Sequence, residues 1–375
     1  MSKVYAMQIP LFNLCNLNCK FCYQNSYGKR TNKFDLSYLE GLPEKVIDAH
    51  RKLFNDRGIT DLYPTIYGGE PFNDALPVSI FDEYKKFCDR FTKLLKDEFN
   101  ITTHYIWLTN GVVNRYDLID DLLEYTHGTI NTSYDPCDRF ANEKQRANWW
   151  RTLNYYRDRM NMVTMVTTKA NINAVLSGKD NFLLEVPKNI PIDVSYYFPV
   201  ADDYKEFCID DDDIYNLFVY GLDNGLFNWV NIANLIKTFT DPKHVVRNCN
   251  CLDTSFCFQN EDNSMTPLLT CYSTIDFAMH HNVDDYYKNE DYDAIVNTPD
   301  EKRRIIGIKR RGCLYCEYSD RCQRMCYMLP SHKDYKQNEV CPFIQLYTYI
   351  KKHPYLIDKY KAFCKEVTLN VTKER

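Results

Sequence analysis

The chain has no run of apolar residues long enough to cross a membrane. A membrane-spanning helix needs roughly 18 or more predominantly apolar residues in succession, and no run in these 375 residues approaches that length. The start of the chain also lacks the apolar core and the small-residue cleavage site of a signal peptide. We therefore expect a cytoplasmic protein without a membrane partner.

A strong charge of either sign is missing as well. The 51 acidic and 46 basic residues give a net charge of -5, which provides no chain-wide positive field for a nucleic-acid backbone. No nucleic-acid partner is expected. Repeats, low-complexity segments and Pro-, Gly- or Ser-rich linkers are absent, and 45% of the residues are hydrophobic. The composition thus suits one large or two medium globular domains.

Cysteine, in contrast, is abundant. Sixteen cysteines are too many for core packing alone, and a reducing cytoplasm disfavours structural disulfides. Three of them lie in the first 22 residues, eleven lie from Cys208 onward, and only Cys88 and Cys137 fall between. This uneven distribution favours thiolate coordination of metal at two places in the chain.

The first two hundred residues alternate short β-rich runs with stretches of helical period. In residues 79–99, Ile80, Tyr84, Phe87 and Cys88 fall on one helical face, which predicts a helix packed on a core. Such alternation predicts an α/β fold, a parallel sheet with right-handed crossovers curled into a partial barrel of about six strand-helix units. The strands are expected at residues 3–12, 61–69, 101–110, 129–135, 162–170 and 192–200.

The pattern changes after Asp202. One helical stretch is expected from about Asp211 to Thr240, and a last helix is expected from Pro342 to Val367. The cysteine-dense region between them, residues 249–341, shows little long periodicity. We expect it to depend on metal for folding, because it cannot bury enough apolar surface by itself.

Three of the cysteines share one short segment, "CNLNCKFCY". Cys15, Cys19 and Cys22 follow an expected strand, so their thiolates can converge on one centre. A four-iron cluster held by cysteines needs four of them, and with three local ligands one iron would remain open to an exogenous ligand. A zinc site and a redox dithiol of Cys19 and Cys22 are the alternatives, although the dithiol would leave Cys15 without a role.

This spacing, CxxxCxxC followed by the aromatic Tyr23, resembles the cluster-binding loop of radical S-adenosylmethionine (SAM) enzymes. The resemblance implies a [4Fe-4S] cluster whose open iron is chelated by the amino and carboxylate groups of SAM. One-electron reduction then splits the sulfonium and yields a 5'-deoxyadenosyl radical. A flavodoxin- or ferredoxin-like protein is the expected reductant.

Motifs at later strand ends agree with this resemblance. "GGEP" provides Gly68, Gly69 and Glu70, and in the family this motif receives the amino group of SAM. Glycines permit close backbone approach, and a carboxylate can accept from an ammonium group. "TNG" adds Asn110 to the cofactor-binding set one strand further on. All of these residues share the face on which α/β barrels build their sites.

"SYD" places Ser133 and Asp135 at the end of the fourth expected strand. For the carboxylate of SAM, the resemblance indicates Ser133 and an arginine about a dozen residues further on, which makes Arg146 the candidate. Arg139 and Arg151 are its competitors. The chain departs from the family after Asp135, where "DPC" stands in place of the usual glycine.

A second motif, "CLYCEYSDRCQRMC", resembles the SPASM extension, an auxiliary-cluster module of one branch of the family. The resemblance implies two closed [4Fe-4S] clusters and hence three clusters in all. Thr266 replaces a glycine of the module, and Cys249 is an alternative to Cys251. A pair of zinc knuckles is the alternative for the whole segment. The expected ligands are Cys251, Cys257, Cys271 and Cys326 for one cluster and Cys313, Cys316, Cys322 and Cys341 for the other.

These resemblances predict abstraction of a hydrogen atom from an unactivated carbon. Closed auxiliary clusters suit an electron acceptor, which favours oxidation or crosslinking of a peptide or protein side chain, as in the sulfatase-maturase and peptide-modifying branch. In that branch an acidic residue follows the third upstream cysteine, whereas Tyr272 follows Cys271 here. An unperturbed tyrosine is a poor base. Asp135, Tyr272 and Asp276 are therefore the candidate catalytic residues.

Two further functions remain open, namely dehydrogenation of a small alcohol or sugar and a non-catalytic zinc-binding interaction protein. Only fourteen residues precede Cys15, so no leader-recognition domain is expected, and a peptide would bind directly or arrive with a separate recognition protein. The expected domains are the radical SAM barrel (1–205), a helical bridge (206–248), a SPASM-like iron-sulfur domain (249–345) and a C-terminal helix (346–375).

Overall fold

The computed structural model describes residues 4–22, 36–197, 207–241, 254–259, 265–269, 317–318, 322 and 341–373. The chain divides into two compact units. The first comprises Met1–Ser133, Asp138–Asn161 and Asn250–Tyr292, and the second comprises Tyr134–Cys137, Met162–Cys249 and Asp293–Arg375.

A parallel sheet forms the core of the first unit. Its strands β1 (Val4–Pro10), β2 (Asp61–Tyr67), β4 (Ile106–Thr109) and β5 (Thr129–Ser133) lie in the order β5-β4-β2-β1. β1 and β2 pair over their whole length, from Val4 opposite Asp61 to Pro10 opposite Tyr67. Buried and more exposed side chains alternate along β1, as expected of a strand that covers a core with one face.

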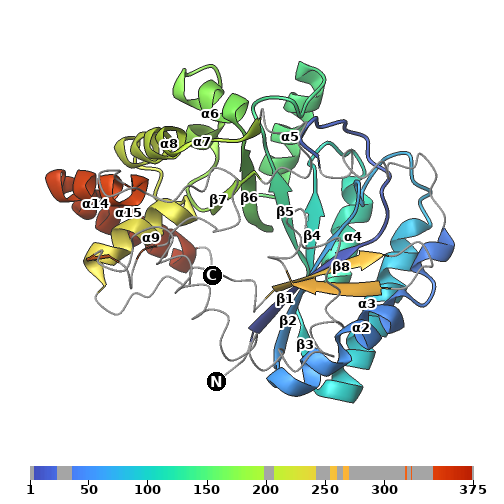
Figure 1. Ribbon diagram of the computed structural model, residues 1–375. Helices are drawn as coiled ribbons and strands as arrows, with labels where there is room; N and C mark the ends of the chain where they lie inside the picture. Colours follow the sequence, from blue (N-terminus) through green and yellow to red (C-terminus); the bar gives the residue numbers. More distant parts are fainter. Residues whose placement is uncertain are drawn as a thin grey trace. The chain divides into compact units, whose positions relative to one another are not determined.

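Helices connect these strands, as crossover connections of a parallel sheet require. They are α2 (Leu42–Arg57), preceded by a 3-10 turn at Leu36–Leu39, α3 (Ile80–Phe99), α4 (Tyr116–Thr126) and α5 (Glu143–Tyr155). The predicted apolar face of α3 is buried, including Cys88. α3 ends where Asn100 adopts a left-handed conformation, and it packs against both α2 and α4 (Figure 1).

The cysteine-dense region contributes two strands to this sheet, which the sequence did not predict. β8 (Thr254–Gln259) runs parallel to β1, with Ala6 opposite Thr254, and β9 (Met265–Leu269) returns antiparallel to β8. Both are drawn in orange in Figure 1. The sheet therefore continues beyond β1 on the side away from β2.

The second unit has its own strand pair and a group of helices. β6 (Met160–Thr167), which begins in the first unit, pairs parallel with β7 (Ile192–Tyr196), with Val163 opposite Ile192. Phe218 on α8 packs against Trp229 (centroids 4.9 Å apart) and against Phe343 on α14 (6.0 Å). The helices are α6 (Lys169–Leu176), α7 (Phe182–Glu185), α8 (Asp211–Asp223), α9 (Val230–Thr240), α14 (Pro342–Lys352) and α15 (Tyr355–Lys373).

Two expected helices are each divided in two. The helix predicted over Asp211 to Thr240 is α8 and α9, because Gly225 adopts a left-handed conformation (φ 66°) after the end of α8. The helix predicted from Pro342 to Val367 is α14 and α15, since Pro354 has no N-H with which to continue the first helix.

The expected strand at residues 101–110 is also in two pieces, β3 (Thr102–Thr103) and β4. Both pieces pair with β2. The interruption coincides with Tyr105, whose buried hydroxyl donates to the Cys88 carbonyl on α3 (2.9 Å).

The parallel pairing and the alternation of strands with helices confirm the predicted α/β class, a parallel half-barrel sheet with helices. Each of the six strands expected in the first two hundred residues is present near its predicted limits, one of them in two pieces. None of the helices within the described ranges is both long and apolar enough to cross a membrane.

Candidate active site

The chain that leads into the first cysteine lies against the turn after β2. Gly69 N-H donates to the Phe12 carbonyl (2.7 Å), and Glu70 N-H donates to the Leu14 carbonyl (2.8 Å). These bonds continue the backbone pairing of β1 with β2 beyond the ends of both strands. The position of Cys15 is therefore determined in part by backbone groups 54 and 55 residues further along the chain.

The glycines of this turn have no room for a side chain. A Cβ atom on Gly69 would lie 2.0 Å from the carbonyl oxygen of Leu14 and 2.8 Å from the backbone nitrogen of Cys15. One on Gly68 would lie 2.7 Å from the carbonyl oxygen of Phe12. Since all of these atoms belong to the backbone, only glycine allows so close an approach. The backbone that these glycines approach belongs to the segment 12–22, which carries the first three cysteines and is called the cysteine loop below.

The carboxylate of Glu70 is buried and joins the ends of two strands. Its Oε1 accepts hydrogen bonds from the N-H of Phe72 (3.0 Å) and the hydroxyl of Thr109 (2.8 Å), and its Oε2 accepts from the N-H of Asn110 (2.5 Å). Burial raises the pKa of Glu70 to about 7, although these bonds and the Arg139 guanidinium oppose the rise.

This geometry gives Glu70 a structural task that the sequence did not indicate. The resemblance implied that the motif receives the amino group of SAM, whereas both oxygens of the carboxylate accept from protein groups here. Glu70 thereby holds the end of β2 against the end of β4. Thr109, one of its donors, was not among the expected site residues.

Asn110 connects the end of β4 with the cysteine loop. Its Nδ2 donates to Asn16 Oδ1 (2.6 Å) and to the Sγ of Cys15 (3.6 Å), while its Oδ1 accepts from Val112 N-H (2.8 Å). Asn16 in turn donates through Nδ2 to the Val112 carbonyl (2.7 Å). The N-H of Leu17 also donates to Cys15 Sγ (3.4 Å). Two N-H groups thus point at one sulfur atom.

The other two cysteines lie further along the same loop. Cys19 is buried, and its carbonyl accepts from Cys22 N-H (3.2 Å). Lys20 in between is fixed by an ion pair with Asp138 (2.7 Å). The part of the chain that the structure describes contains no three His, Cys, Asp or Glu side chains gathered closely enough to hold a metal ion. The structure places the three thiols in one loop without bringing their sulfur atoms to one point.

The donor atoms of this loop nevertheless suit an iron-sulfur cluster. Three thiols within eight residues are the ligand type that such clusters use, and N-H donors to a ligand sulfur accompany them. The backbone nitrogen of the first ligand, Cys15, also lies 2.8 Å from where a Cβ atom of Gly69 would be. The residues present therefore fit the cluster, and its ligation belongs to the proposal below.

The described contacts place Arg139 beside Ser133. Arg139 is largely buried, and its Nη2 donates to Ser133 Oγ (2.6 Å). Arg146, the expected partner, forms an ion pair with Glu143 one helical turn away (3.4 Å). Arg151 donates to asparagine side chains. Among the three candidate arginines, the geometry therefore favours the one that lies six residues after Ser133.

Asp135, an expected catalytic base, has a buried carboxylate with structural partners. Its Oδ1 accepts from the N-H of Val166 (2.8 Å) and from Nδ2 of Asn171 (3.2 Å). Nearby, Cys137 Sγ contacts the Ala170 carbonyl (3.6 Å). These bonds hold the segment after β5 against β6 and α6. The role of Asp135 as substrate base stays a prediction.

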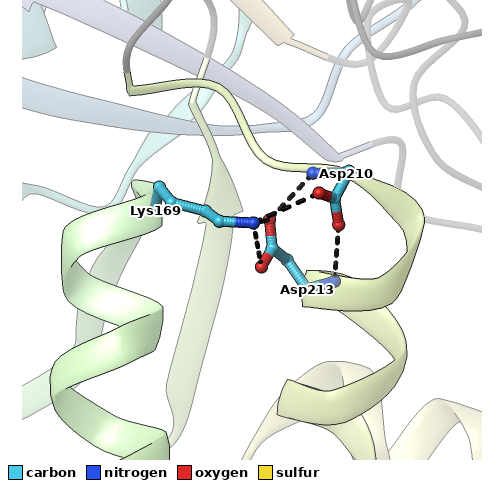
Figure 2. A network of polar contacts seen from close by, with 3 residues as sticks. All are labelled: Lys169, Asp210 and Asp213. Atoms are coloured by element: carbon cyan, nitrogen blue, oxygen red, sulfur yellow. Dashed lines mark hydrogen bonds and ion pairs between the residues drawn. The ribbon is translucent and has the colours of Figure 1, made fainter.

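A polar network that the sequence did not predict joins α6 to α8 in the second unit. Nζ of Lys169 contacts Asp210 Oδ2 (3.1 Å) and both oxygens of Asp213 (2.7 and 2.6 Å), as Figure 2 shows. Asp210 and Asp213 also form a capping box at the start of α8. The sequence signal was the acidic run at residues 210–213 directly before a helical pattern.

Several expected site residues lie outside the described residues. Of the auxiliary ligands, Cys322 and Cys341 are described: Cys322 is buried, with its N-H bonded to the Tyr318 carbonyl (2.8 Å), and Cys341 directly precedes α14. The backbone of Cys257 lies in β8. Those not described are Tyr23, Cys249, Cys251, Cys271, Tyr272, Asp276, Cys313, Cys316 and Cys326.

Comparison with known proteins agrees with the site. Residues 9–172 match the family model of the radical SAM superfamily. The radical SAM cyclopropyl synthase TigE of Paramaledivibacter caminithermalis is 25% identical over 256 residues, which cover 60% of this chain and 48% of TigE. The chain therefore spans about half the length of this curated relative.

A solved structure, that of BtrN in complex with AdoMet and 2-DOIA, is similar at 14% sequence identity, with a TM-score of 0.28 over 53% of this chain and 72% of that one. The family match is the informative finding, since it covers the cysteine loop, the Gly68 to Glu70 turn, Asn110 and Ser133. A radical SAM domain of this kind implies a [4Fe-4S] cluster and SAM. Residues 9–172 of the chain are a radical SAM domain.

Proposed function

We propose that the protein is a radical SAM enzyme that abstracts a hydrogen atom from a peptide or protein side chain, with auxiliary iron-sulfur clusters taking up an electron. The observation that carries the radical SAM assignment is the cysteine loop, fastened to the glycine turn after β2 and to Asn110 after β4. The family match over residues 9–172 supports it.

In this proposal, Cys15, Cys19 and Cys22 hold a [4Fe-4S] cluster. Bound with SAM, such a cluster supplies the one-electron reduction that yields a 5'-deoxyadenosyl radical. The chain's own contribution is to position the ligands. Gly69 allows the loop to lie against β2, and Glu70 fixes the ends of β2 and β4 beneath it.

Ser133 and Arg139 are the proposed partners of the SAM carboxylate. A guanidinium group presents several N-H donors in a planar arrangement that matches a carboxylate. Arg139 is already oriented by its bond to Ser133 (2.6 Å), and its burial would strengthen a charge interaction. We retain Arg146 only as the sequence-based alternative.

Anaerobic reconstitution with iron and sulfide tests the assignment. We expect a brown protein that forms 5'-deoxyadenosine from SAM when dithionite is added. Cys19→Ala should abolish this product, while Cys88→Ala, at a buried position on α3, should retain it. A colourless protein that holds zinc and cleaves no SAM would instead indicate the zinc-binding interaction protein.

The auxiliary clusters and the substrate class need separate tests. A chain that holds two auxiliary clusters in addition to the SAM-binding cluster should contain about 12 irons. A chain that holds the SAM-binding cluster alone should contain about 4. Incubation with the product of any short Cys-, Ser- or Tyr-containing reading frame beside the gene should yield a peptide that has lost two hydrogen atoms or gained a crosslink. An unchanged peptide, together with oxidation of a small alcohol or sugar, would establish the small-molecule alternative.

A further inference from the structure

We propose that the side-chain amide of Asn110 raises the reduction potential of the cluster at the cysteine loop, by donating a hydrogen bond to the ligand sulfur of Cys15. This role goes beyond SAM binding, which the sequence resemblance implied for Asn110. The inference rests on the proposed function, because it requires a cluster held by Cys15, Cys19 and Cys22.

The orientation of the Asn110 amide follows from its hydrogen-bond partners. Its Oδ1 accepts from the N-H of Val112 (2.8 Å), and a backbone N-H can only donate. Nδ2 must therefore lie on the opposite side, where it contacts Asn16 Oδ1 (2.6 Å) and Cys15 Sγ (3.6 Å). A reversed amide would place two donors, Val112 N-H and Nδ2, against each other.

The orientation of Asn16 agrees independently. Its Nδ2 donates to the Val112 carbonyl (2.7 Å), and a carbonyl can only accept. The Oδ1 of Asn16 is therefore the atom that faces Asn110, and it requires a donor there. The two amides fix each other with an N-H directed at the sulfur of Cys15.

The backbone of Asn110 is held as well. Its N-H donates to Oε2 of the buried Glu70 (2.5 Å), and only 8% of the residue is exposed. The amide is thus fixed at both ends before it meets the sulfur. A donor that does not have to reorient interacts with a charged ligand at little entropic cost.

Hydrogen bonds to ligand sulfurs are one of the means by which a protein adjusts an iron-sulfur potential. Reduction adds negative charge to the cluster and its thiolates, so an N-H directed at a sulfur stabilises the reduced state more than the oxidised state. Loss of the Asn110 donor should therefore make the cluster harder to reduce. The Leu17 N-H, the second donor to Cys15, belongs to the backbone and stays in every side-chain variant.

Two variants remove the donor in different ways. Asn110→Ala removes the whole amide, and Asn110→Asp keeps an oxygen for Val112 N-H but has no N-H for the sulfur. Asn131→Ala is the matched control. Asn131 lies on the neighbouring strand β5, is also 8% exposed, and its Oδ1 accepts from Asn161 (2.9 Å).

The measurement is the midpoint potential of the SAM-binding cluster, from a dithionite titration followed by electron paramagnetic resonance. To isolate this cluster, all chains carry Cys322→Ser and Cys326→Ser, which remove one expected ligand from each of the two proposed auxiliary clusters. We expect the equilibrium constant for reduction to fall threefold to tenfold in Asn110→Ala, at ~59 mV per tenfold for one electron. Asn110→Asp should fall at least as far, because its carboxylate adds negative charge. Asn131→Ala should match the parent.

The outcomes separate the two proposals. A parent chain that binds no iron would contradict the proposed function. A parent that forms the cluster, with Asn110→Ala and Asn110→Asp at the parent potential, would overturn only the role of Asn110. That role is also overturned if both variants remain folded by circular dichroism but lose the cluster, since Asn110 would then only hold the loop in place. An equal shift of the midpoint potential in Asn131→Ala would overturn it as well.

Discussion

At Gly69, the absence of a side chain decides whether the cysteine loop can lie against β2. Two backbone atoms of the loop occupy the space that a Cβ would need, at 2.0 and 2.8 Å. Backbone atoms cannot rotate away as the end of a flexible side chain can. The sequence predicted close backbone approach at this glycine, but it could not show that the atoms approached belong to Leu14 and Cys15.

Gly69→Ala is therefore expected to displace the loop. Iron bound after reconstitution should fall to below half of the wild-type content at the first site. Gly178→Ala is the contrasting variant, since its Cβ would meet nothing within 4 Å but its φ of +70° strains any other residue. That variant should lower the stability by about 1 kcal/mol and leave the iron content unchanged. Equal iron loss in both would contradict a steric cause.

His50 on α2 should make the stability of the protein depend on pH. The ring is buried and its Nδ1 contacts the Val46 carbonyl (2.9 Å). Burial lowers the pKa of His50 to about 4, from 6.5. Above pH 6.5 neither the folded nor the unfolded state binds the proton, so the stabilisation is complete. As the pH falls from 6.5 toward 4, only the unfolded state is protonated, and stability is lost.

His50→Leu should remove this dependence. At pH 5 the wild type is expected to have lost about 2 kcal/mol through His50 relative to pH 7.5, and the variant should not show this part of the loss. Urea unfolding followed by circular dichroism at both pH values measures the difference. Parallel losses in the two proteins would show that His50 does not titrate in this way.

The choice among three arginines shows where reasoning from one sequence ends at the residue scale. Arg139, Arg146 and Arg151 all follow Ser133 within 18 residues. Spacing favoured Arg146, but that side chain points along α5 to Glu143, and Arg139 in the preceding loop reaches Ser133. The direction of a side chain depends on where its helix begins, which sequence patterns locate least well.

Among the elements, the start of α8 depends on a side chain from α6. Lys169 lies between the two acidic residues of the capping box, and the side chain of Asp213 is only 9% exposed. Loss of the ammonium group would leave two carboxylates close together without their cation (Figure 2). Because 41% of the Lys169 side chain is exposed, solvent screens part of this interaction.

Lys169→Met should accordingly lower the free energy of unfolding by about 1 to 2 kcal/mol. Lys93→Met is the matched control, because Lys93 pairs with Asp97 on the surface of α3 and both side chains are more than half exposed. That variant should cost at most about 0.5 kcal/mol. Chemical unfolding of the two variants at the same salt concentration provides the comparison. Similar losses in the free energy of unfolding would show that the ion pairs of Lys169 with α8 stabilise the fold no more than an exposed surface pair does.

The elements of the first two hundred residues were predictable because their hydrophobic periods are strong. α3, with its buried stripe, and β1, with its alternation, are examples. The divisions at Gly225 and Pro354 were less visible, since each interrupts a pattern that continues on both sides. Local residue preferences ended these helices where the apolar period alone predicted continuation.

For the whole molecule, the proposed auxiliary clusters predict how the iron lost in two single cysteine variants compares with the iron lost in the double variant. The family pattern assigns Cys322 and Cys341 to one cluster. Cys322→Ser and Cys341→Ser should each remove about 4 irons per chain, and the double variant should remove no more than either alone. Iron analysis after reconstitution measures this. Cys88→Ser is the control without iron loss, and additive losses would place the two cysteines in different sites.

The membership of β8 and β9 in the first sheet could not be predicted from their sequence. β1 ends at Pro10 and β8 begins only at Thr254, and nothing local to residues 254–269 indicates which strand they join. The pairing of β8 with β1 depends on the edge of β1 that β2 does not occupy, and this edge is known only once the sheet is assembled. The same limit applies to the cysteines of this region, whose grouping rests on the family pattern and not on described contacts.

The backbone bonds from Gly69 and Glu70 to the cysteine loop have a thermodynamic consequence for metal binding. Ordering the backbone of one residue costs roughly 1 to 2 kcal/mol in conformational entropy. In Phe12 and Leu14 this loss is incurred when the sheet forms, since their carbonyls are held by the turn after β2. The proposed capture of iron by Cys15 would then start from an ordered segment, so more of the intrinsic strength of the iron-thiolate bond would be retained as affinity.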